Sequence, residues 1–483
     1  MRELICIAST LPERIYQSNS SMKITGKTLR NLGYRPGKWF KSAIAYANEQ
    51  ELEGNALCKY LDSVAPVMVE PRAEGIPFHQ NIRAETPKEQ VNVESVLFGM
   101  SELMKTPTLI DGAVMPDACP TGPPGTIPVG GIAVAENAIH PAMHSADVCC
   151  SVMMTSFGEI SPKEVLDAAH RTTHFGGGGR EPEQQFSLDD QLLRDLKGNP
   201  FFRTSKAEIL AKSHLGTQGD GNHFLYVGIS EQTGETVMVT HHGSRGLGAY
   251  LYQQGMRVAE NFRKEISPRS YQKNAWIPFD TQVGADYWAA LQLVRRWTKA
   301  NHRVLHDDTL RRLKTEGTER FWNEHNFVFR EGNNFYHAKG ATPLDNRFVP
   351  DGKDGLRLVP LNMAEPVLIV RGATTDTNLG FAPHGAGRNE SRTSYMRSQA
   401  HKTTAQIFAE ETAGLDVRFY SGHVDISELP GAYKNAENVQ TQMKEFGLGE
   451  VVDRILPYGC IMAGDWKRDA PWRKRKQRRA KRR

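Results

Sequence analysis

The amino-acid sequence predicts an α+β fold that ends in a strongly basic tail. Strand-like and helix-like segments are mixed along the chain without the strict alternation of a doubly wound sheet. The 483 residues are 39% hydrophobic and 24% charged, which is enough apolar material for a large globular core or a few domains. No internal repeat and no long low-complexity linker precede the tail.

Local patterns predict the individual elements in chain order. Residues 25–44 contain a Pro-Gly pair between two helix-like stretches and predict a short helix, a turn and the start of a second helix. Residues 108–154 are rich in Gly, Pro, Ala and Val and predict loops with short buried strands. β-Prone apolar runs and helical periodicity then predict strands at 224–228, 237–240 and 365–370 and helices at 285–307 and 433–446.

The C-terminal tail carries most of the positive charge. From Lys467 to Arg483 there are eleven Lys or Arg and one Asp, a net charge of +10. Because the whole chain is +5, the other 466 residues carry −5. A segment with so little to bury is predicted to be disordered. It is either a solubility element or an arm that binds nucleic acid, and eleven cations on an acidic body favour the nucleic acid.

Composition also predicts a cytoplasmic location and no membrane partner. No apolar run approaches the roughly 20 residues that span a bilayer. The first ten residues have too short an apolar segment and too early a carboxylate for a secretory signal. Six cysteines are scattered without a disulfide framework, which is typical of a reducing compartment where a cysteine more often binds metal or reacts.

The stretch Gly380–Arg388, which reads GFAPHGAGR, is the most informative motif. Glycines beside His384 allow close approach of backbone and ligand, and their N–H groups with Arg388 suit phosphate oxygens. His384 could attack phosphorus, bind a metal or do neither.

Four other motifs carry metal-binding residue types. Each also has a structural explanation, such as a capped turn, a hairpin or a satisfied histidine. Together they offer a carboxylate, a thiolate and several imidazoles, which suit Mn, Zn or Co. Two such ions would stabilise the attacking and leaving oxygens of phosphoryl or nucleotidyl transfer. The motifs are His144–Cys150, Gly216–Phe224, His241–Gly248 and Glu324–Asn326.

In this order, Asp-x-x-Cys, Gly-Asn-His-Phe, His-x-Gly-Ser-Arg-Gly-Leu-Gly, His-Asn and His-Gly-Ala-Gly-Arg resemble the RtcB family of RNA-splicing ligases. The resemblance extends from about Pro107 to about Gly464 and includes Lys339–Pro343 and Ala432–Lys434. It implies a catalytic domain of mixed β-sheets flanked by helices at 107–464. A divergent N-terminal part at 1–106 would pack on this domain, and the tail would occupy 465–483.

The family resemblance also implies an activity and a set of site residues. RNA ends with a 2′,3′-cyclic phosphate or 3′-phosphate would be joined to a 5′-hydroxyl, with two Mn ions and GTP. His384 would carry the covalent GMP, and Cys150 would bridge the two ions. Because thiolate and imidazole ligands bind metal only when deprotonated, we expect activity to fall in acid. The implied metal ligands are Asp147, Cys150, His223, His241 and His325, and the implied nucleotide-binding residues are Asn222, His223, Phe224, Asn326, Met363, Gly385, Ala386, Gly387, Arg388 and Tyr433.

The chain departs from the family pattern where the guanine base is read. Tyr226 stands where the family usually has a Glu, and Met462 or Ala463 stands where it usually has a Lys. Losing a carboxylate and an ammonium removes much of the hydrogen bonding that separates guanine from adenine. We therefore expect weaker base discrimination than in typical members. His242 replaces a usual Ser or Thr, and Asn362–Ala364 replaces a usual Ser-Met-Gly.

Three functions remain in competition at this point. The first is an RNA ligase for repair or splicing, with broken tRNA or ribosomal RNA as plausible substrates. The second is a metal-dependent RNA-end phosphodiesterase or nucleotidyl-capping enzyme that does not seal. The third is an RNA-binding protein without catalysis, which would need neither a thiolate nor a nucleophilic histidine.

Overall fold

The computed structural model describes residues 23–37, 39–350, 352 and 355–467, and the chain forms two compact units. The smaller unit contains the residues up to Val69 together with Glu265–Pro268, and the larger unit contains the rest. Residues 70–106 thus belong to the larger unit, and the packing of an N-terminal part on the catalytic domain stays a prediction. The predicted disorder of the tail concerns residues that lie outside the described ranges, apart from those up to Lys467.

The smaller unit is a group of three helices, α1 (Gly26–Asn31), α2 (Trp39–Glu49) and α3 (Gly54–Val64). The two helices predicted for residues 25–44 are confirmed, but the turn between them lies at Leu32–Gly33 and not at the Pro-Gly pair. Thr25 begins α1, because its hydroxyl accepts a hydrogen bond from the backbone N–H of Thr28. Buried apolar residues of all three helices form one core, which includes Leu29, Phe40, Ala43, Leu57 and Leu61.

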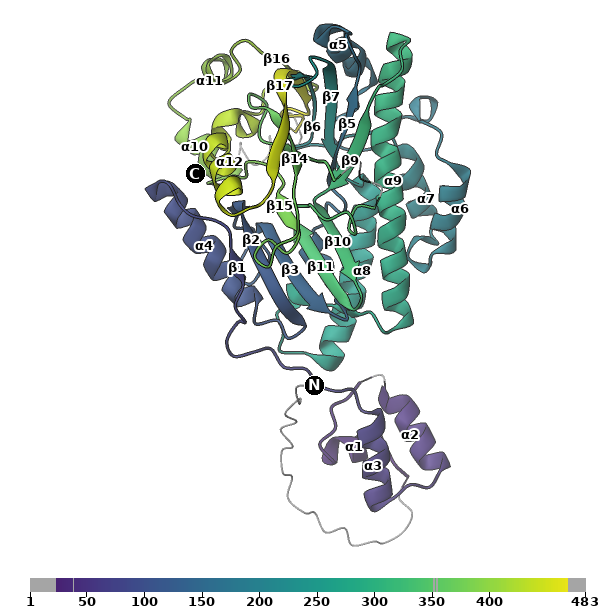
Figure 1. The fold of residues 1–483 in the computed structure, drawn as a ribbon. Coiled ribbons are helices and arrows are strands. Elements are labelled where there is room, and N and C mark those ends of the chain that lie inside the picture. The colour runs from purple at the N-terminus through teal and green to yellow at the C-terminus, as the bar shows by residue number, and fades with distance from the viewer. Residues whose placement is uncertain (1–22, 38, 351, 353–354, 468–483) are drawn as a thin grey trace, which may run out of the picture. The chain divides into compact units, whose positions relative to one another are not determined.

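The larger unit confirms the α+β prediction and is built on two large sheets (Figure 1). Its strands are β1 (His79–Gln80), β2 (Leu109–Cys119), β3 (Val129–Glu136), β4 (Ala138–Ile139), β5 (Ser151–Ser156), β6 (Phe224–Ser230), β7 (Thr236–His242), β8 (Ile277–Pro278), β9 (Arg320–Glu324), β10 (Asn326–Glu331), β11 (Asn334–Lys339), β12 (Ala341–Pro343), β13 (Arg357–Pro360), β14 (Val367–Arg371), β15 (Phe381–Pro383), β16 (Asp416–Phe419) and β17 (Glu450–Met462).

The sheets are mixed, with antiparallel pairs predominating. One sheet has the order β1-β2-β3-β11-β10, and the other has the order β13-β14-β17-β6-β7-β5-β9 with β16 beside β17. Among the named strands, only β1–β2 and β16–β17 pair in parallel. The predicted strands at 224–228 and 237–240 lie in β6 and β7, whereas the strand predicted at 365–370 begins only at Val367, as β14. Within residues 108–154, β2 is longer than the short strands expected, since it pairs with both β1 and β3.

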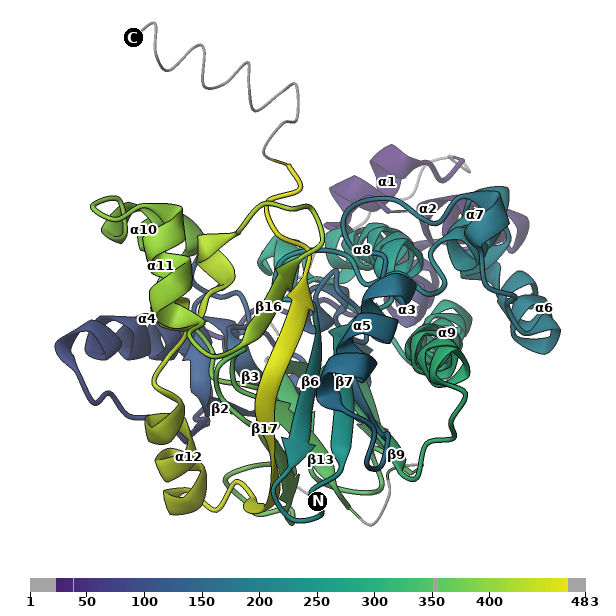
Figure 2. The same cartoon turned by 90° about the horizontal axis from the view of Figure 1, so that it is seen from above.

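Helices flank these sheets on several sides (Figures 1 and 2). The helix predicted at 285–307 lies within the 32-residue α9, which packs against β5 and β7. The helix predicted at 433–446 begins only at Ala436, because Asn435 caps it through the N–H of Asn438. The helices of the larger unit are α4 (Pro87–Leu103), α5 (Pro162–Thr172), α6 (Asp190–Gly198), α7 (Ser205–Ser213), α8 (Arg245–Ile266), α9 (Gln282–Leu313), α10 (Arg392–Ser398), α11 (Thr404–Glu411) and α12 (Ala436–Glu445).

The helix α8 was not expected from the sequence. Gly246 and Gly248 in its first turn suggest a glycine turn that ends a strand. In the structure they are required by close packing, because a Cβ at Gly248 would lie 1.7 Å from the hydroxyl oxygen of Ser244. None of the helices in the described part of the chain combines the length and apolarity needed to cross a membrane.

Asn301 on α9 connects this helix to the loop at residues 216–223. Its Oδ1 accepts hydrogen bonds from the backbone N–H groups of Gly216 (2.6 Å) and Thr217 (3.2 Å), and its Nδ2 donates to the carbonyl of Thr217 (3.0 Å). Asn301 is fully buried, so water cannot replace it as a partner. The helix therefore fixes the start of a loop that ends at His223.

Replacing Asn301 by Ala is expected to destabilise the larger unit, because each buried backbone group left unpaired costs about 1–3 kcal/mol. Chemical denaturation followed by tryptophan fluorescence measures the loss. The matched control is Asn333→Ala, since Asn333 is exposed in the turn between β10 and β11. Equal transitions for the two variants would contradict this role.

Candidate active site

Four neighbouring strands of the eight-stranded sheet have their ends close together at the same end of the sheet. Ser151, the first residue of β5, pairs with His242 on β7 and with Glu324 on β9. Phe224, the first residue of β6, pairs with His241. Because neighbouring strands run antiparallel, the residues that flank these ends fall together in space. They are Cys150, His223, His241 and His325.

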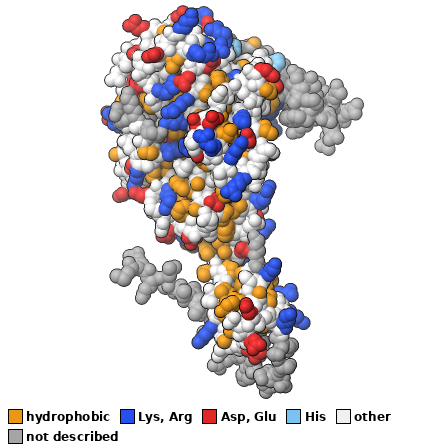
Figure 3. Space-filling model, turned by 90° about the vertical axis from the view of Figure 1, so that its right-hand side faces the viewer, with side chains coloured by type: hydrophobic (Ala, Val, Ile, Leu, Met, Phe, Trp, Pro, Cys, Tyr) orange, Lys and Arg blue, Asp and Glu red, His pale blue; other side chains and the backbone are white. Residues whose placement is uncertain are grey.

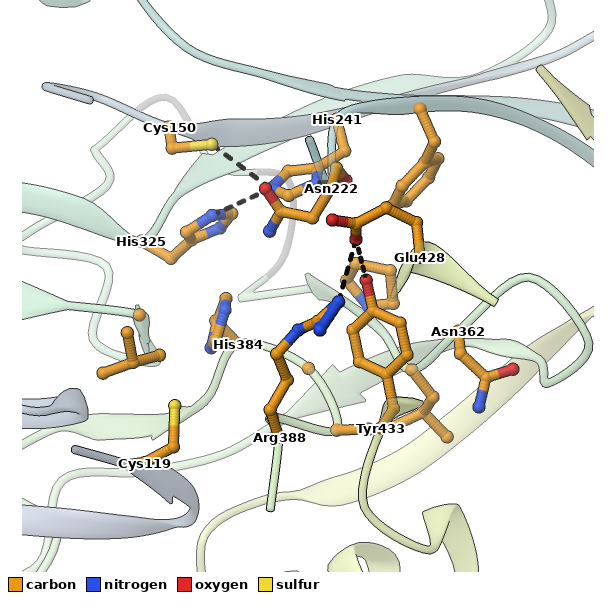
Figure 4. Close-up of a pocket in the computed structure, with 18 of the residues that line it drawn as sticks. Cys119, Cys150, Asn222, His241, His325, Asn362, His384, Arg388, Glu428 and Tyr433 are labelled. Atoms are coloured by element: carbon orange, nitrogen blue, oxygen red, sulfur yellow. Dashed lines mark hydrogen bonds and ion pairs between the residues drawn. The ribbon is translucent and has the colours of Figure 1, made fainter. Parts of the chain in front are cut away.

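These side chains form two groups that share Cys150. The Sγ of Cys150 lies 3.2 Å from Nε2 of His241 and 3.5 Å from Nε2 of His223. Nε2 of His223 is also 3.2 Å from Oδ2 of Asp147, and Nε2 of His241 is 3.1 Å from Nε2 of His325 (Figure 4). Cys150, His241 and His325 could hold one metal ion, and Asp147, Cys150 and His223 could hold another.

The hydrogen bonds around the imidazoles fit a pair of cations. Nδ1 of His223 lies 2.6 Å from the carbonyl oxygen of Gln218, and Nδ1 of His241 lies 3.0 Å from that of Asn222. A carbonyl oxygen only accepts, so both Nδ1 atoms carry a proton and Nε2 is the nitrogen through which each ring can bind a metal. The nitrogen, sulfur and carboxylate oxygen atoms of the cluster therefore lie close together, and there are too few protons to form a hydrogen bond between each pair of them. This donor set is chemically suited to a borderline divalent metal.

The backbone of the turn at Asp147–Cys150 is strained into position. Cys149 has a φ of +61°, in the left-handed region that non-glycine residues rarely adopt. Two backbone hydrogen bonds to the β9–β10 connection hold it, from Cys149 N–H to Asn326 (2.6 Å) and from His325 N–H to Cys150 (2.9 Å). Gly243 is needed opposite this turn, because a Cβ there would lie 2.2 Å from a carboxylate oxygen of Asp147.

Burial sets the protonation of the cluster. It lowers the pKa of His241 to about 3 and the pKa of His325 well below its usual value, so both rings are neutral at neutral pH. Burial, with Asp147 beside it, raises the pKa of the Cys150 thiol well above its usual value. A metal bound at this thiol must displace its proton, so binding weakens as the pH falls.

His384 lies next to this cluster with a defined tautomer. It follows β15, whose pairing of Pro383 with Ala341 places it beside His325, with ring centroids 4.9 Å apart. Its Nδ1 lies 2.6 Å from Oδ2 of the buried Asp117, and its backbone N–H donates to the same oxygen at 3.1 Å. A carboxylate accepts, so Nδ1 carries a proton and Nε2 is the nitrogen that can bind or attack a ligand.

Glycines around His384 are required by contact. A Cβ at Gly340 would lie 2.9 Å from the ring of His384, and a Cβ at Gly387 would lie 1.9 Å from the carbonyl oxygen of Asp117. Gly387 also has a φ of +71°. The glycine-rich motif thus allows the chain to pass closely over the strand that carries Asp117.

A cavity of about 550 Å³ joins the metal-binding residues to the predicted nucleotide-binding residues. His384 and four of the predicted metal ligands, Asp147, Cys150, His241 and His325, line it. His223 does not line the cavity, but it contacts Asp147 and Cys150 of the cluster. The other predicted nucleotide-binding residues line it as well, namely Asn222, Phe224, Asn326, Met363, Gly385, Ala386, Gly387, Arg388 and Tyr433.

Glu428 connects several side chains of the cavity wall near His384 through hydrogen bonds (Figure 4). This buried carboxylate accepts hydrogen bonds from Tyr433 (2.7 Å), Arg388 (3.2 Å) and Arg392 (2.5 Å). The guanidinium of Arg388 also lies 4.8 Å from the centroid of the Tyr433 ring. Among the described residues, Nη1 of Arg388 has no hydrogen-bond partner although it is buried. This nitrogen belongs to a residue that lines the cavity and has a hydrogen bond left to donate.

Sequence reasoning missed Asp117 and Glu428. Asp117 lies among the buried residues of β2, and a charged residue inside an otherwise apolar strand is a sign that could have identified it. Glu428 lies in a short 3-10 turn with no pattern that distinguishes it from exposed acids nearby.

The end of the cavity near Tyr226 is mostly apolar. Tyr226 is 1% exposed, and its hydroxyl donates to the carbonyl of Ile455 at 2.8 Å. Cys460 and Met462 line the cavity beside it. Of the two residues at the position of the usual Lys, Met462 therefore faces the cavity and Ala463 is buried in the core.

Replacing Cys150 by Ala is expected to reduce metal binding at both groups, because its sulfur belongs to each. His325→Ala should reduce binding at one group only. Metal content after dialysis against Mn measures both effects, by elemental analysis. The control is Cys149→Ala, because Cys149 is an equally buried neighbour outside both groups. Equal metal retention by the two cysteine variants would contradict the shared ligand.

Comparison with known proteins identifies the family to which the chain belongs. The sequence model of a family described as "tRNA-splicing ligase RtcB" matches residues 183–463. Proteins named tRNA-splicing ligase RtcB are similar over much of the chain. The one from Thermococcus kodakarensis is 26% identical over 407 residues, which cover 69% of this chain and 84% of that protein.

Two further relatives have the same name. The protein from Aeropyrum pernix is 28% identical over 307 residues, or 53% of this chain and 62% of its own length. The protein from Pyrococcus abyssi is 27% identical over 307 residues, and this chain spans only 32% of its length. The family match covers more than half of the chain, so the protein belongs to the RtcB family as a divergent member.

Proposed function

We propose that this protein is an RNA ligase that joins 2′,3′-cyclic phosphate or 3′-phosphate RNA ends to 5′-hydroxyl ends. The observation that carries the proposal is the lone pair of His384, which Asp117 orients beside two groups of metal-binding side chains in one cavity. Membership in a family described as tRNA-splicing ligases supports RNA as the substrate.

His384 acts as the nucleophile in this proposal. Its Nε2 attacks the α-phosphorus of GTP, a phosphorus–nitrogen bond forms, and the bond to the leaving pyrophosphate breaks. The ring then carries a positive charge, which the buried carboxylate of Asp117 balances through the Nδ1 proton. Arg388 binds a phosphate oxygen through its free Nη1.

The metal-binding residues complete the phosphate site. Asp147, Cys150 and His223 would hold one ion, and Cys150, His241 and His325 the other. We propose Mn, while the donor set also suits Zn or Co. When bound, the ions neutralise phosphate oxygens and so favour nucleotidyl transfer.

Sealing then requires two further transfers. Water opens a cyclic end to a 3′-phosphate, and an oxygen of this phosphate attacks the nucleotide on His384, which releases the histidine. The 5′-hydroxyl of the second RNA attacks the activated 3′-phosphorus, and the nucleoside monophosphate leaves. Broken tRNA or ribosomal RNA would meet these requirements.

Wild-type protein with Mn and GTP is expected to join such RNA ends, whereas His384→Ala is expected to lose both the covalent nucleotide and joining. Denaturing gels with labelled nucleotide and labelled RNA measure the two steps. His401→Ala is the control, because His401 is exposed and does not line the cavity. A labelled adduct that survives in His384→Ala would contradict the nucleophile. Adduct formation without joining would instead favour the non-sealing enzyme.

Base discrimination is expected to be weaker than in typical family members. The hydroxyl of Tyr226 is already bonded to the carbonyl of Ile455, and Met462 offers no hydrogen bond, so this end of the cavity does not separate guanine from adenine by charge. Adduct formation with labelled GTP and ATP at equal concentration is the measurement. A strong preference for GTP would reject this expectation.

A further inference from the structure

The helices of the smaller unit separate positive from negative charge along the chain. Residues 23–48, which contain α1 and all but the last residue of α2, have six Lys or Arg and no Asp or Glu. Residues 49–69, which contain α3, have four acidic residues and one lysine. On the larger unit in Figure 3, by contrast, basic and acidic side chains are interspersed. The smaller unit therefore has a basic part, and the family match at residues 183–463 does not reach its three helices.

Five cations of this basic part are exposed, and none of them has an acidic partner among the described residues. Surface lysines elsewhere in the chain do have one, as Lys163 has in Asp167, at 2.7 Å. A cation without such a partner keeps its charge for a ligand. We call the five residues the basic surface, and they are Lys23, Lys27, Arg30, Arg35 and Lys41.

The packing of α1 along α2 brings these cations onto neighbouring segments. The start of α1 lies beside the end of α2, because Asn48 forms hydrogen bonds with the backbone N–H and carbonyl of Ile24, at 2.8 and 2.9 Å. The connection between the helices closes at Tyr34, whose ring centroid lies 5.8 Å from that of Trp39. The basic surface thus extends over α1, the connection and the first turn of α2.

The apolar side chains of this segment are not placed to enter a membrane. Ile24, Leu29 and Phe40 are buried in the core of the unit. Tyr46 is 46% exposed, but its ring stacks on that of Tyr60, with centroids 4.6 Å apart. A helix that binds a membrane surface needs exposed apolar side chains beside its cations. The basic surface therefore suits a polyanion in water.

The phosphate backbone of a nucleic acid is the polyanion that fits these cations. Each Lys or Arg that neutralises a phosphate releases a counterion, and this release supplies affinity without reading the sequence. Proteins that bind single strands add aromatic rings on which bases stack. The rings of Tyr34, Trp39 and Tyr46 already pack against other rings of the unit. The surface is therefore suited to double-helical RNA, whose phosphates are exposed while its bases face inward.

We propose that the basic surface binds the phosphate backbone of a double-helical part of the RNA whose end enters the cavity. This contact is independent of sequence and holds a structured RNA on the enzyme between the steps of joining. The identity of the polyanion as RNA rests on the proposed function, whereas the surface itself rests on the charge and exposure of its five residues. An acidic protein is the alternative partner that the experiment must exclude.

The test compares two full-length variants that lose the same charge. The first variant combines Lys27→Gln, Arg30→Gln and Lys41→Gln. The control replaces three exposed lysines outside both the basic surface and the cavity, and it combines Lys59→Gln, Lys206→Gln and Lys444→Gln. Because all six side chains are exposed, neither variant should disturb a core. An RNA hairpin with a stem of about 20 base pairs, longer than the roughly 16 that a double-stranded RNA-binding domain spans, is titrated at several salt concentrations.

The first variant is expected to bind the hairpin at least about tenfold more weakly at about 0.1 M salt. Its log–log salt slope should fall by about 2 to 3, because three phosphate contacts are lost. The control should bind like wild type. Adduct formation without RNA should be the same in both variants and in wild type, since none of the replaced residues lines the cavity.

Two results would overturn the proposal. One is equal affinity of the first variant and the control for the hairpin. The other is displacement of the hairpin from wild-type protein by polyglutamate at equal charge concentration, which would indicate an acidic protein as the partner. Failure of the proposed function is seen separately, as wild-type protein that forms no adduct and joins no ends while the difference between the two variants persists.

Discussion

The convergence of lone pairs on Cys150 is the constraint on which the site depends. Two backbone carbonyls fix the tautomers of His223 and His241, so their free nitrogens face sulfur and carboxylate. Such a cluster is unfavourable without a cation and favourable with one. The close packing of these donor atoms requires the positive φ of Cys149 and the absence of a side chain at Gly243. The register of four antiparallel strands brings them there.

Much of the site could be predicted because its chemistry is concentrated in short motifs. The glycine-rich stretch around His384 and the His-bearing strand ends can be recognised locally, and the structure brings these residues to one cavity. The partner of His384 could not be found this way, because Asp117 lies 267 residues away and only sheet pairing brings it near. The same reason hid Glu428, because its two arginine partners, Arg388 and Arg392, lie 40 and 36 residues away in the sequence.

The fold was predictable at the level of class and of the strongest elements. Strands β6 and β7 and helix α9 have clear apolar periodicity, and the structure contains them. Helix α8 was missed because its first turn contains two glycines, of which Gly246 is required by contact with Leu210 and His214, far away in the sequence. The compact unit that ends at Val69 was not predicted, since the prolines near it, Pro66 and Pro71, do not by themselves distinguish a domain boundary from a loop. Both features depend on tertiary packing, which cannot be predicted from the local sequence.

The bond from Tyr226 to the carbonyl of Ile455 has a consequence for how such an enzyme can diversify. It joins strands β6 and β17, and neither Tyr226 nor Ile455 belongs to the two groups of metal-binding side chains. Substitutions at this end of the cavity alter the shape offered to a base without disturbing any donor atom of the cluster. The shape of this part of the cavity and the set of metal-binding donors can therefore change independently over evolutionary time.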